Sequence, residues 1–240
     1  MTKQTIFVIG NAGRNPEAFQ TKTGQTAVSF PLAANRNWTD KKTGEKQEAT
    51  QWFRVTAWNG RGESVLKHVQ TGSQVLVLGR VSSSAWINAE GEPRSTVELT
   101  ADQVVLLDKG GSHLETWIVG RLGGDPELRW TKSGTPVASF SLAASRGWFD
   151  DNGQWQEVTD WLKVTAWRKL GELASEYLRK GRLVFIRGHV GAEAWTGKDG
   201  QPQCGLTLTA REIKFLRDGN GNGRKTEPGS VVYEDEQAGF

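Results

Sequence analysis

The feature that most constrains this 240-residue chain is an internal repeat, in which one pattern occurs twice about 110 residues apart. Early in each copy the offset is 110, and it relates Gly10, Pro16, Phe30, Arg36 and Trp38 to Gly120, Pro126, Phe140, Arg146 and Trp148. Later the offset is 109, and it relates Trp52, Trp58, Gly72 and Trp86 to Trp161, Trp167, Gly181 and Trp195. A long repeat of this kind predicts two copies of one domain. We expect them at residues 1–108 and 114–217, joined by a linker at 109–113.

Each copy shows several strand-like runs and one helix. The strand-like runs of the first copy are residues 5–10, 27–34, 51–58, 74–86 and 96–107, and each has a counterpart in the second copy. Apolar residues at helical spacing predict a helix over 169–181, and 63–72 is its weaker equivalent. Five strands with a short α-helix between the third and fourth predict an all-β chain of two tandem five-stranded barrels of the OB type.

The third strand of each copy separates two kinds of side chain, because successive residues in a strand point to opposite faces. In residues 51–58 the face with Phe53, Val55 and Ala57 is apolar, and the other face carries Trp52, Arg54, Thr56 and Trp58. Trp161, Lys163, Thr165 and Trp167 repeat the second face. Burying an unpaired cation is costly, so we expect this face to point outward.

Outward tryptophans interleaved with a cation fit single-stranded nucleic acid, which presents unstacked bases and phosphates. Trp38 and Trp148 follow Arg36 and Arg146, and Trp86 and Trp195 end the fourth strands. Any one of these tryptophans could equally pack in a core or a loop, but their recurrence in both copies favours a shared binding role. Trp117, Trp130 and Trp155 have no tryptophan counterpart, and we assign them mainly to packing, with Trp130 and Trp155 as weaker binding candidates.

Composition narrows the remaining classes of function. One cysteine excludes an intrachain disulfide, and three scattered histidines lack the spacing of a zinc site, so we expect no metal and no cofactor. The mean hydropathy of −0.53 and the absence of a long apolar run argue against a membrane protein or a secretion signal. We therefore expect a cytoplasmic protein. No convergent carboxylates or nucleophile with its base are evident, so we do not expect an enzyme.

The last residues differ from both copies. Residues 218–240 match neither repeat and carry a formal charge of −3, whereas 1–109 and 110–217 carry +3 each. The run from Asp218 to Gly223 has no core-forming residue, which predicts a disordered acidic tail.

Several combined motifs resemble the bacterial single-stranded DNA-binding proteins, in the form with two OB domains per chain. In the second copy they are residues 119–127, 143–148, 160–164 and 173–181, and in the first copy, more loosely, residues 8–11, 15–17, 33–38 and 51–55. The resemblance implies sequence-independent binding of single-stranded DNA in replication, recombination and repair. The base-stacking aromatic positions of that family fall on Trp38, Trp52, Trp58, Trp86, Trp148, Trp161, Trp167 and Trp195. We expect Arg36, Arg54, Arg146 and Lys163 to contact phosphates.

The resemblance also implies partners. One-domain relatives usually form tetramers, so a two-domain chain is expected to form a homodimer with four OB domains. The acidic tip of the family recruits genome-maintenance proteins, a role that would fall here on Glu234, Asp235, Glu236 and Phe240, with a solvated tail lacking a partner as the alternative. Residues 82–85 and 191–194 lack the basic residues usual before the fourth-strand tryptophan, so fewer phosphate contacts are expected there.

Other ligands fit parts of the same pattern. Single-stranded RNA would offer the same bases and phosphates, and no residue visibly selects against a 2′-hydroxyl. A carbohydrate-binding module would use tryptophan platforms to stack on sugar rings, and it is the alternative to DNA binding. The response to salt separates the two, because only phosphate binding weakens steeply as ionic strength rises.

Overall fold

The computed structural model describes residues 3–21, 24–39, 43–107, 113–149 and 152–216. The first copy contains β1 (Lys3–Ala12), β2 (Glu17–Gln20), β3 (Thr26–Thr39), β4 (Lys46–Trp58), α1 (Gly60–His68), β5 (Gln74–Ile87) and β6 (Pro93–Leu106). The second contains β7 (His113–Leu122), β8 (Glu127–Trp130), β9 (Pro136–Phe149), β10 (Trp155–Trp167), α2 (Arg168–Tyr177), β11 (Leu183–Thr196) and β12 (Pro202–Phe215). No described helix is long and apolar enough to cross a membrane.

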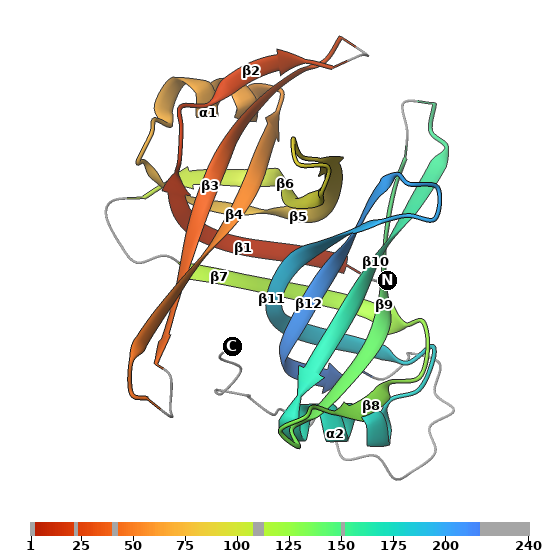
Figure 1. The fold of residues 1–240 in the computed structure, drawn as a ribbon. Coiled ribbons are helices and arrows are strands. Elements are labelled where there is room, and N and C mark those ends of the chain that lie inside the picture. Colours follow the sequence, from red (N-terminus) through yellow and green to blue (C-terminus); the bar gives the residue numbers. More distant parts are fainter. Residues whose placement is uncertain (1–2, 22–23, 40–42, 108–112, 150–151, 217–240) are drawn as a thin grey trace.

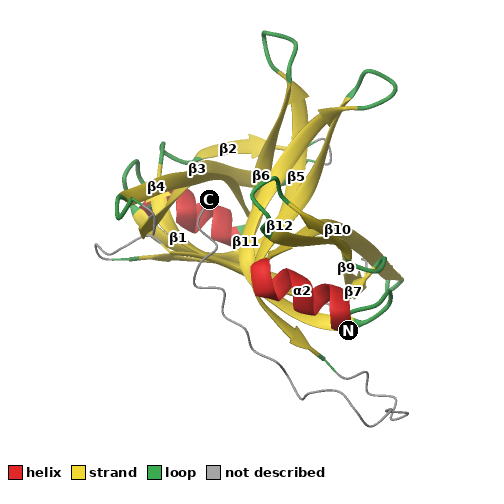
Figure 2. Ribbon diagram, turned by 60° about the horizontal axis from the view of Figure 1, so that its bottom comes forward, coloured by secondary structure: helices red, strands yellow, loops and turns green. Residues whose placement is uncertain are grey.

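Each copy forms a small closed barrel (Figure 1). In the first barrel the neighbours run β3, β4, β6, β5, β1, and pairing of Asn11 with Ala33 between β1 and β3 closes the ring. The pairing of β4 with β6 is parallel, and the second barrel repeats this order with β9, β10, β12, β11 and β7. One helix follows the third long strand of each barrel, and Figure 2 shows the two helices on separate barrels. The prediction of two tandem OB barrels is confirmed.

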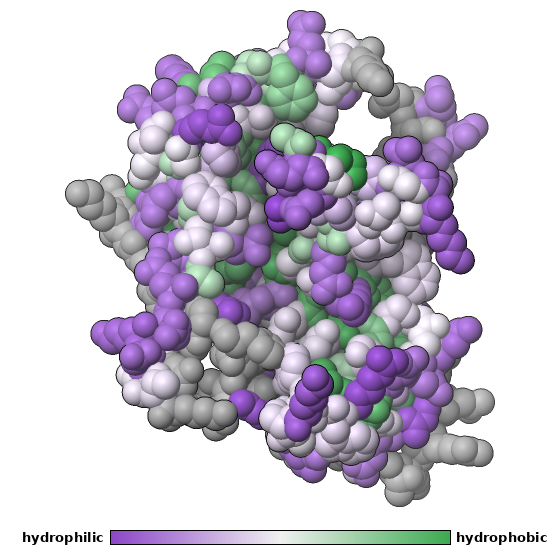
Figure 3. All heavy atoms as spheres, viewed as in Figure 1, coloured by the Kyte–Doolittle hydropathy of each residue, from purple (hydrophilic) through white to green (hydrophobic). Residues whose placement is uncertain are grey.

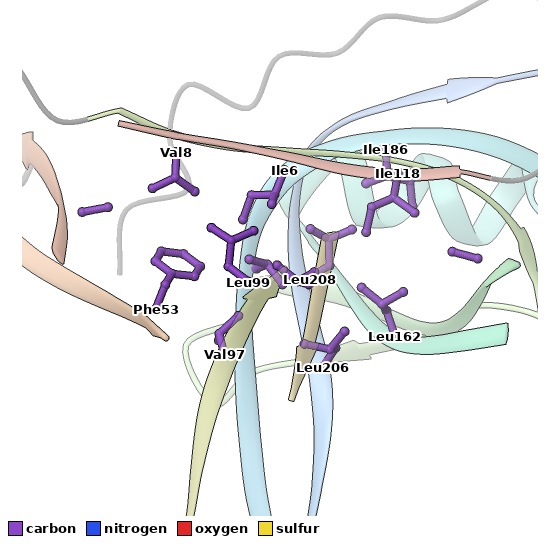
Figure 4. Packing of buried hydrophobic residues seen from close by; sticks show 14 of the residues in the cluster. Ile6, Val8, Phe53, Val97, Leu99, Ile118, Leu162, Ile186, Leu206 and Leu208 are labelled. Atoms are coloured by element: carbon purple, nitrogen blue, oxygen red, sulfur yellow. The ribbon is translucent and has the colours of Figure 1, made fainter. Parts of the chain in front are cut away.

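The apolar faces of the strands form the core. Phe53, Val55 and Ala57 of β4 are at most 1% exposed, as are Leu162, Val164 and Ala166 of β10. In Figure 4 Phe53 lies with Val8 and Val97 in the first barrel, whereas Leu162 lies in the second. One continuous cluster of buried residues spans both barrels.

The two barrels share one sheet. Strand β1 pairs antiparallel with β7 from Lys3 opposite Val119 to Ile9 opposite His113, and this pairing makes a continuous sheet of 12 strands. The β5–β6 and β11–β12 hairpins also touch, since the Ser95 hydroxyl donates to the Ala192 carbonyl at 3.1 Å. Of the predicted linker, His113 belongs to β7, and 109–112 lie outside the described residues. The division into units 1–108 and 114–217 stays a prediction.

Both helices differ from the predicted ranges. They begin earlier and end at His68 and Tyr177, rather than at the glycines Gly72 and Gly181. The residues after the helices, Val69 and Leu178, are already extended. Gly72 and Gly181 each lie in a separate turn of their own barrel, with φ of +83° and +82°. The Gly181 N–H donates to the Leu122 carbonyl at 2.7 Å, which holds its turn against the end of β7.

Candidate nucleic-acid interface

The outward face of each third long strand presents an open tryptophan. Trp52 of β4 is 51% exposed and Trp161 of β10 is 56% exposed, although the residues that follow them are buried. The alternation of faces therefore runs as the sequence predicts. The other ends of these faces are less open, because Trp58 and Trp167 are half-buried where the strands meet the helices.

Both exposed indoles rest against a glycine turn that follows the first strand of their barrel. A Cβ at Gly13 would lie 2.7 Å from Cζ3 of Trp52, and a Cβ at Gly123 would lie 2.5 Å from Cζ3 of Trp161. The turns are held in place, since the Gly123 N–H donates to the Ser141 carbonyl at 2.9 Å. Each ring is thus fixed on one side while about half of its surface faces solvent, an arrangement that suits stacking of a flat ligand.

Each barrel has a second exposed tryptophan, on its fourth long strand. Trp86 and Trp195, near the ends of β5 and β11, are 42% and 48% exposed. In the second barrel Trp161 and Trp195 line one surface depression together with Lys163 and Glu193. In the first barrel Trp52 lines a depression with Arg14 and Arg54. Hydrophilic side chains cover most of the face seen in Figure 3, with hydrophobic ones showing mainly toward its hollowed middle.

The cation between the tryptophans is paired with a carboxylate in both barrels. Arg54 Nη1 lies 3.2 Å from Glu98 Oε1, and Lys163 Nζ lies 3.1 Å from Glu193 Oε2. Arg54 and Lys163 are 58% and 60% exposed, so both can still reach a ligand.

The structure places Arg36 and Arg146 on a different surface. Arg36 pairs with Ala49 whereas Trp52 pairs with Ala33, so Arg36 and Trp52 lie on opposite faces of the β3–β4 hairpin. Burial lowers the pKa of Arg36 from its ordinary value. The pKa of His189, in the second barrel, is lowered to about 3, first by burial and then by neighbouring positive charges that include Arg36. Arg146 forms an ion pair with Asp160 at 3.5 Å.

Some predicted site residues cannot be placed. Trp38 and Trp148 belong to β3 and β9, but their side chains lie outside the described part of the structure. Glu234, Asp235, Glu236 and Phe240 belong to residues 217–240, which also lie outside the described residues.

The tryptophans without counterparts are more open to solvent than an assignment mainly to packing predicts. Trp130, Trp155 and Trp117 are 63%, 53% and 41% exposed. Trp155 lies six residues before Trp161 on β10 and hence on the same face of that strand, and its ring occupies the space that a side chain at Gly147 would need. Trp155 therefore stays a weaker binding candidate, on the same face of β10 as Trp161.

The described residues include no group of three or more His, Cys, Asp or Glu side chains that could hold a metal ion. The side chains that line the depressions beside Trp52 and Trp161 include aromatic rings, charged groups and hydroxyl groups.

Both barrels match the model of the single-strand binding protein family, over residues 3–107 and 114–216. The single-stranded DNA-binding protein of Deinococcus radiodurans is 30% identical over 232 residues, which cover 90% of this chain and 76% of that protein. The single-stranded DNA-binding protein of Neisseria meningitidis serogroup A is 41% identical over 118 residues, 49% of this chain, and the chain spans only 65% of the length of that protein.

The fold has a close counterpart among solved structures. A crystal structure of a deletion mutant of the single-stranded DNA binding protein from Thermus aquaticus superposes with a TM-score of 0.69 and 25% identity, covering 92% of this chain and 98% of that one. The resemblance seen in the sequence motifs is thus confirmed over both barrels. Because the family model covers most of its length, the chain belongs to the single-strand binding protein family.

Proposed function

We propose that this protein binds single-stranded DNA without regard to sequence and protects it during replication, recombination and repair. The observation that carries the proposal is the repeated outward face, where Trp52 and Trp161 are fixed on one side and open on the other, next to Arg54 and Lys163. Stacking of a base on an aromatic ring is tolerant of sequence, and the cations add attraction to phosphates. The relative from Deinococcus radiodurans, which matches across both barrels, is a single-stranded DNA-binding protein.

We expect a 35-nucleotide oligo-dT to quench the tryptophan fluorescence at nearly stoichiometric concentration, because bases stacked on indoles change their emission. The titration is made at two salt concentrations, and the logarithm of the binding constant should fall by about 0.7 per phosphate contact for each tenfold rise in salt. Unchanged emission would refute the proposal. Emission quenched by an oligosaccharide and insensitive to salt would favour the carbohydrate-binding alternative.

We further propose that two chains form a homodimer with four barrels. The outer face of the shared sheet supports this, because Phe7 and Ile9 of β1 and Leu76 and Leu78 of β5 are only half-buried there. Apolar side chains on a continuous sheet face are stabilised when a second protein surface covers them.

The acidic end of the chain is proposed to recruit genome-maintenance proteins through Glu234, Asp235, Glu236 and Phe240. Truncation after Tyr233 should abolish capture of such proteins and leave DNA affinity equal or slightly higher, because the acidic end competes with DNA for positive groups. Pull-down with the full chain and the truncated chain, beside a DNA titration of both, measures the two effects. Equal capture by the two forms would show that the tail has no such role.

A further inference from the structure

The cation at the centre of each outward face is held by a carboxylate. The ion pairs Arg54–Glu98 and Lys163–Glu193 have nearly equal lengths, 3.2 and 3.1 Å. The paired cations follow Trp52 and Trp161 by two residues, on the same face of β4 and β10.

The two carboxylates come from positions that are not equivalent in the repeat. Glu98 is on β6, and its counterpart in the second barrel is Thr207; Glu193 is on β11, and its counterpart in the first barrel is Ser84. Each barrel therefore has one carboxylate and one hydroxyl at these two positions, exchanged between strands. In the first barrel the hydroxyl reinforces the arrangement, since Ser84 Oγ donates to Glu98 Oε1 at 2.7 Å.

The location of the pairs argues against a purely structural role. Lys163 and Glu193 line the same depression as Trp161 and Trp195, and both are about 60% exposed. Ion pairs this open to solvent contribute little to folding stability. A carboxylate beside the proposed DNA path also repels phosphate, so its presence in both barrels needs a reason connected with binding.

We propose that Glu98 and Glu193 compete with DNA phosphates for Arg54 and Lys163, which holds the affinity for single-stranded DNA below the level that the cations alone would give. This inference rests on the proposed DNA binding. A phosphate that reaches either cation must displace the carboxylate, and the displaced negative charge remains close by. The competition speeds release of the bound strand, because the carboxylate stays close enough to form the ion pair again when the phosphate leaves.

The test is replacement of each carboxylate by its neutral amide, Glu98→Gln and Glu193→Gln, singly and together, in the full chain. Each single change should tighten oligo-dT binding about two- to fivefold, the range that corresponds to an exposed ion pair. The dependence of log K on log salt should steepen by about 0.7 for each freed cation. Glu172→Gln is the matched control, since Glu172 pairs with Lys169 on α2 at 3.5 Å. The DNA affinity of this variant should equal that of the wild type.

The outcomes separate the two proposals. If the wild-type protein binds DNA and the amide variants bind it equally or more weakly, the proposed competition is refuted and the proposed function stands. Wild-type protein that fails to bind DNA overturns the proposed function itself. Thermal melting checks that each variant is folded, and Glu193, which is 59% exposed, keeps the test decisive even if the less exposed Glu98 does not tolerate the change.

Discussion

Trp161→Ala is expected to weaken oligo-dT binding about 5- to 150-fold, which corresponds to the about 1–3 kcal/mol that one stacked base contributes. The indole is 56% exposed and lines the depression between β10 and β11, so its loss removes a stacking surface. The free energy of unfolding should change by no more than about 1 kcal/mol, because the site is exposed. Anisotropy of a labelled oligonucleotide measures the affinity without depending on the remaining tryptophans.

Trp130→Ala is the matched control for Trp161→Ala. Trp130 is 63% exposed, but on β8 it alternates with Arg129 and lies on the side of Leu128, which packs against the core. The sequence makes Trp130 a weaker binding candidate, but the structure places it on a different surface from Trp161. We therefore expect the DNA affinity of Trp130→Ala to remain near that of the wild type. Equal losses in the two variants would contradict the assignment of the β10 face.

Phe53→Ala is expected to lower the free energy of unfolding by about 3–5 kcal/mol, through lost burial and the cavity left behind. Phe53 is 1% exposed and packs in the core of the first barrel, whereas its neighbour Trp52 is 51% exposed. Urea denaturation of Phe53→Ala and Trp52→Ala compares the two faces of one strand. Similar losses of stability in both variants would show that Trp52 belongs to the core.

Alternation along the third strands predicted which face enters the core, but it predicted the open rings only in part. Trp52 and Trp161 are open as expected, whereas Trp58 and Trp167, for which it also predicted open rings, are half-buried. A period of two in residues 51–58 fixes which side chains enter the core, and the repeat confirms the pattern in residues 160–167. Exposure of Trp52 and Trp161 follows from that local rule alone.

Features that depend on pairing with another segment of the chain escaped prediction. Strands β2 and β8 have only four residues each, too few for a periodic pattern to stand out in the sequence, and they form because their backbones pair with β3 and β9. The same limit applies to the interface, since Glu98 reaches Arg54 only when β4 and β6 lie side by side, 44 residues apart in sequence. The half-burial of Trp58 and Trp167 likewise depends on where the strands meet the helices.

The main-chain pairing of β1 with β7 fixes the position of one barrel relative to the other. Because the barrels are joined edge to edge, the distance between them is constant, whereas a flexible linker would let it vary. Under the proposed DNA binding, we expect an oligonucleotide too short to bridge that separation to occupy a single barrel, and only a longer one to gain from the effective concentration of the second.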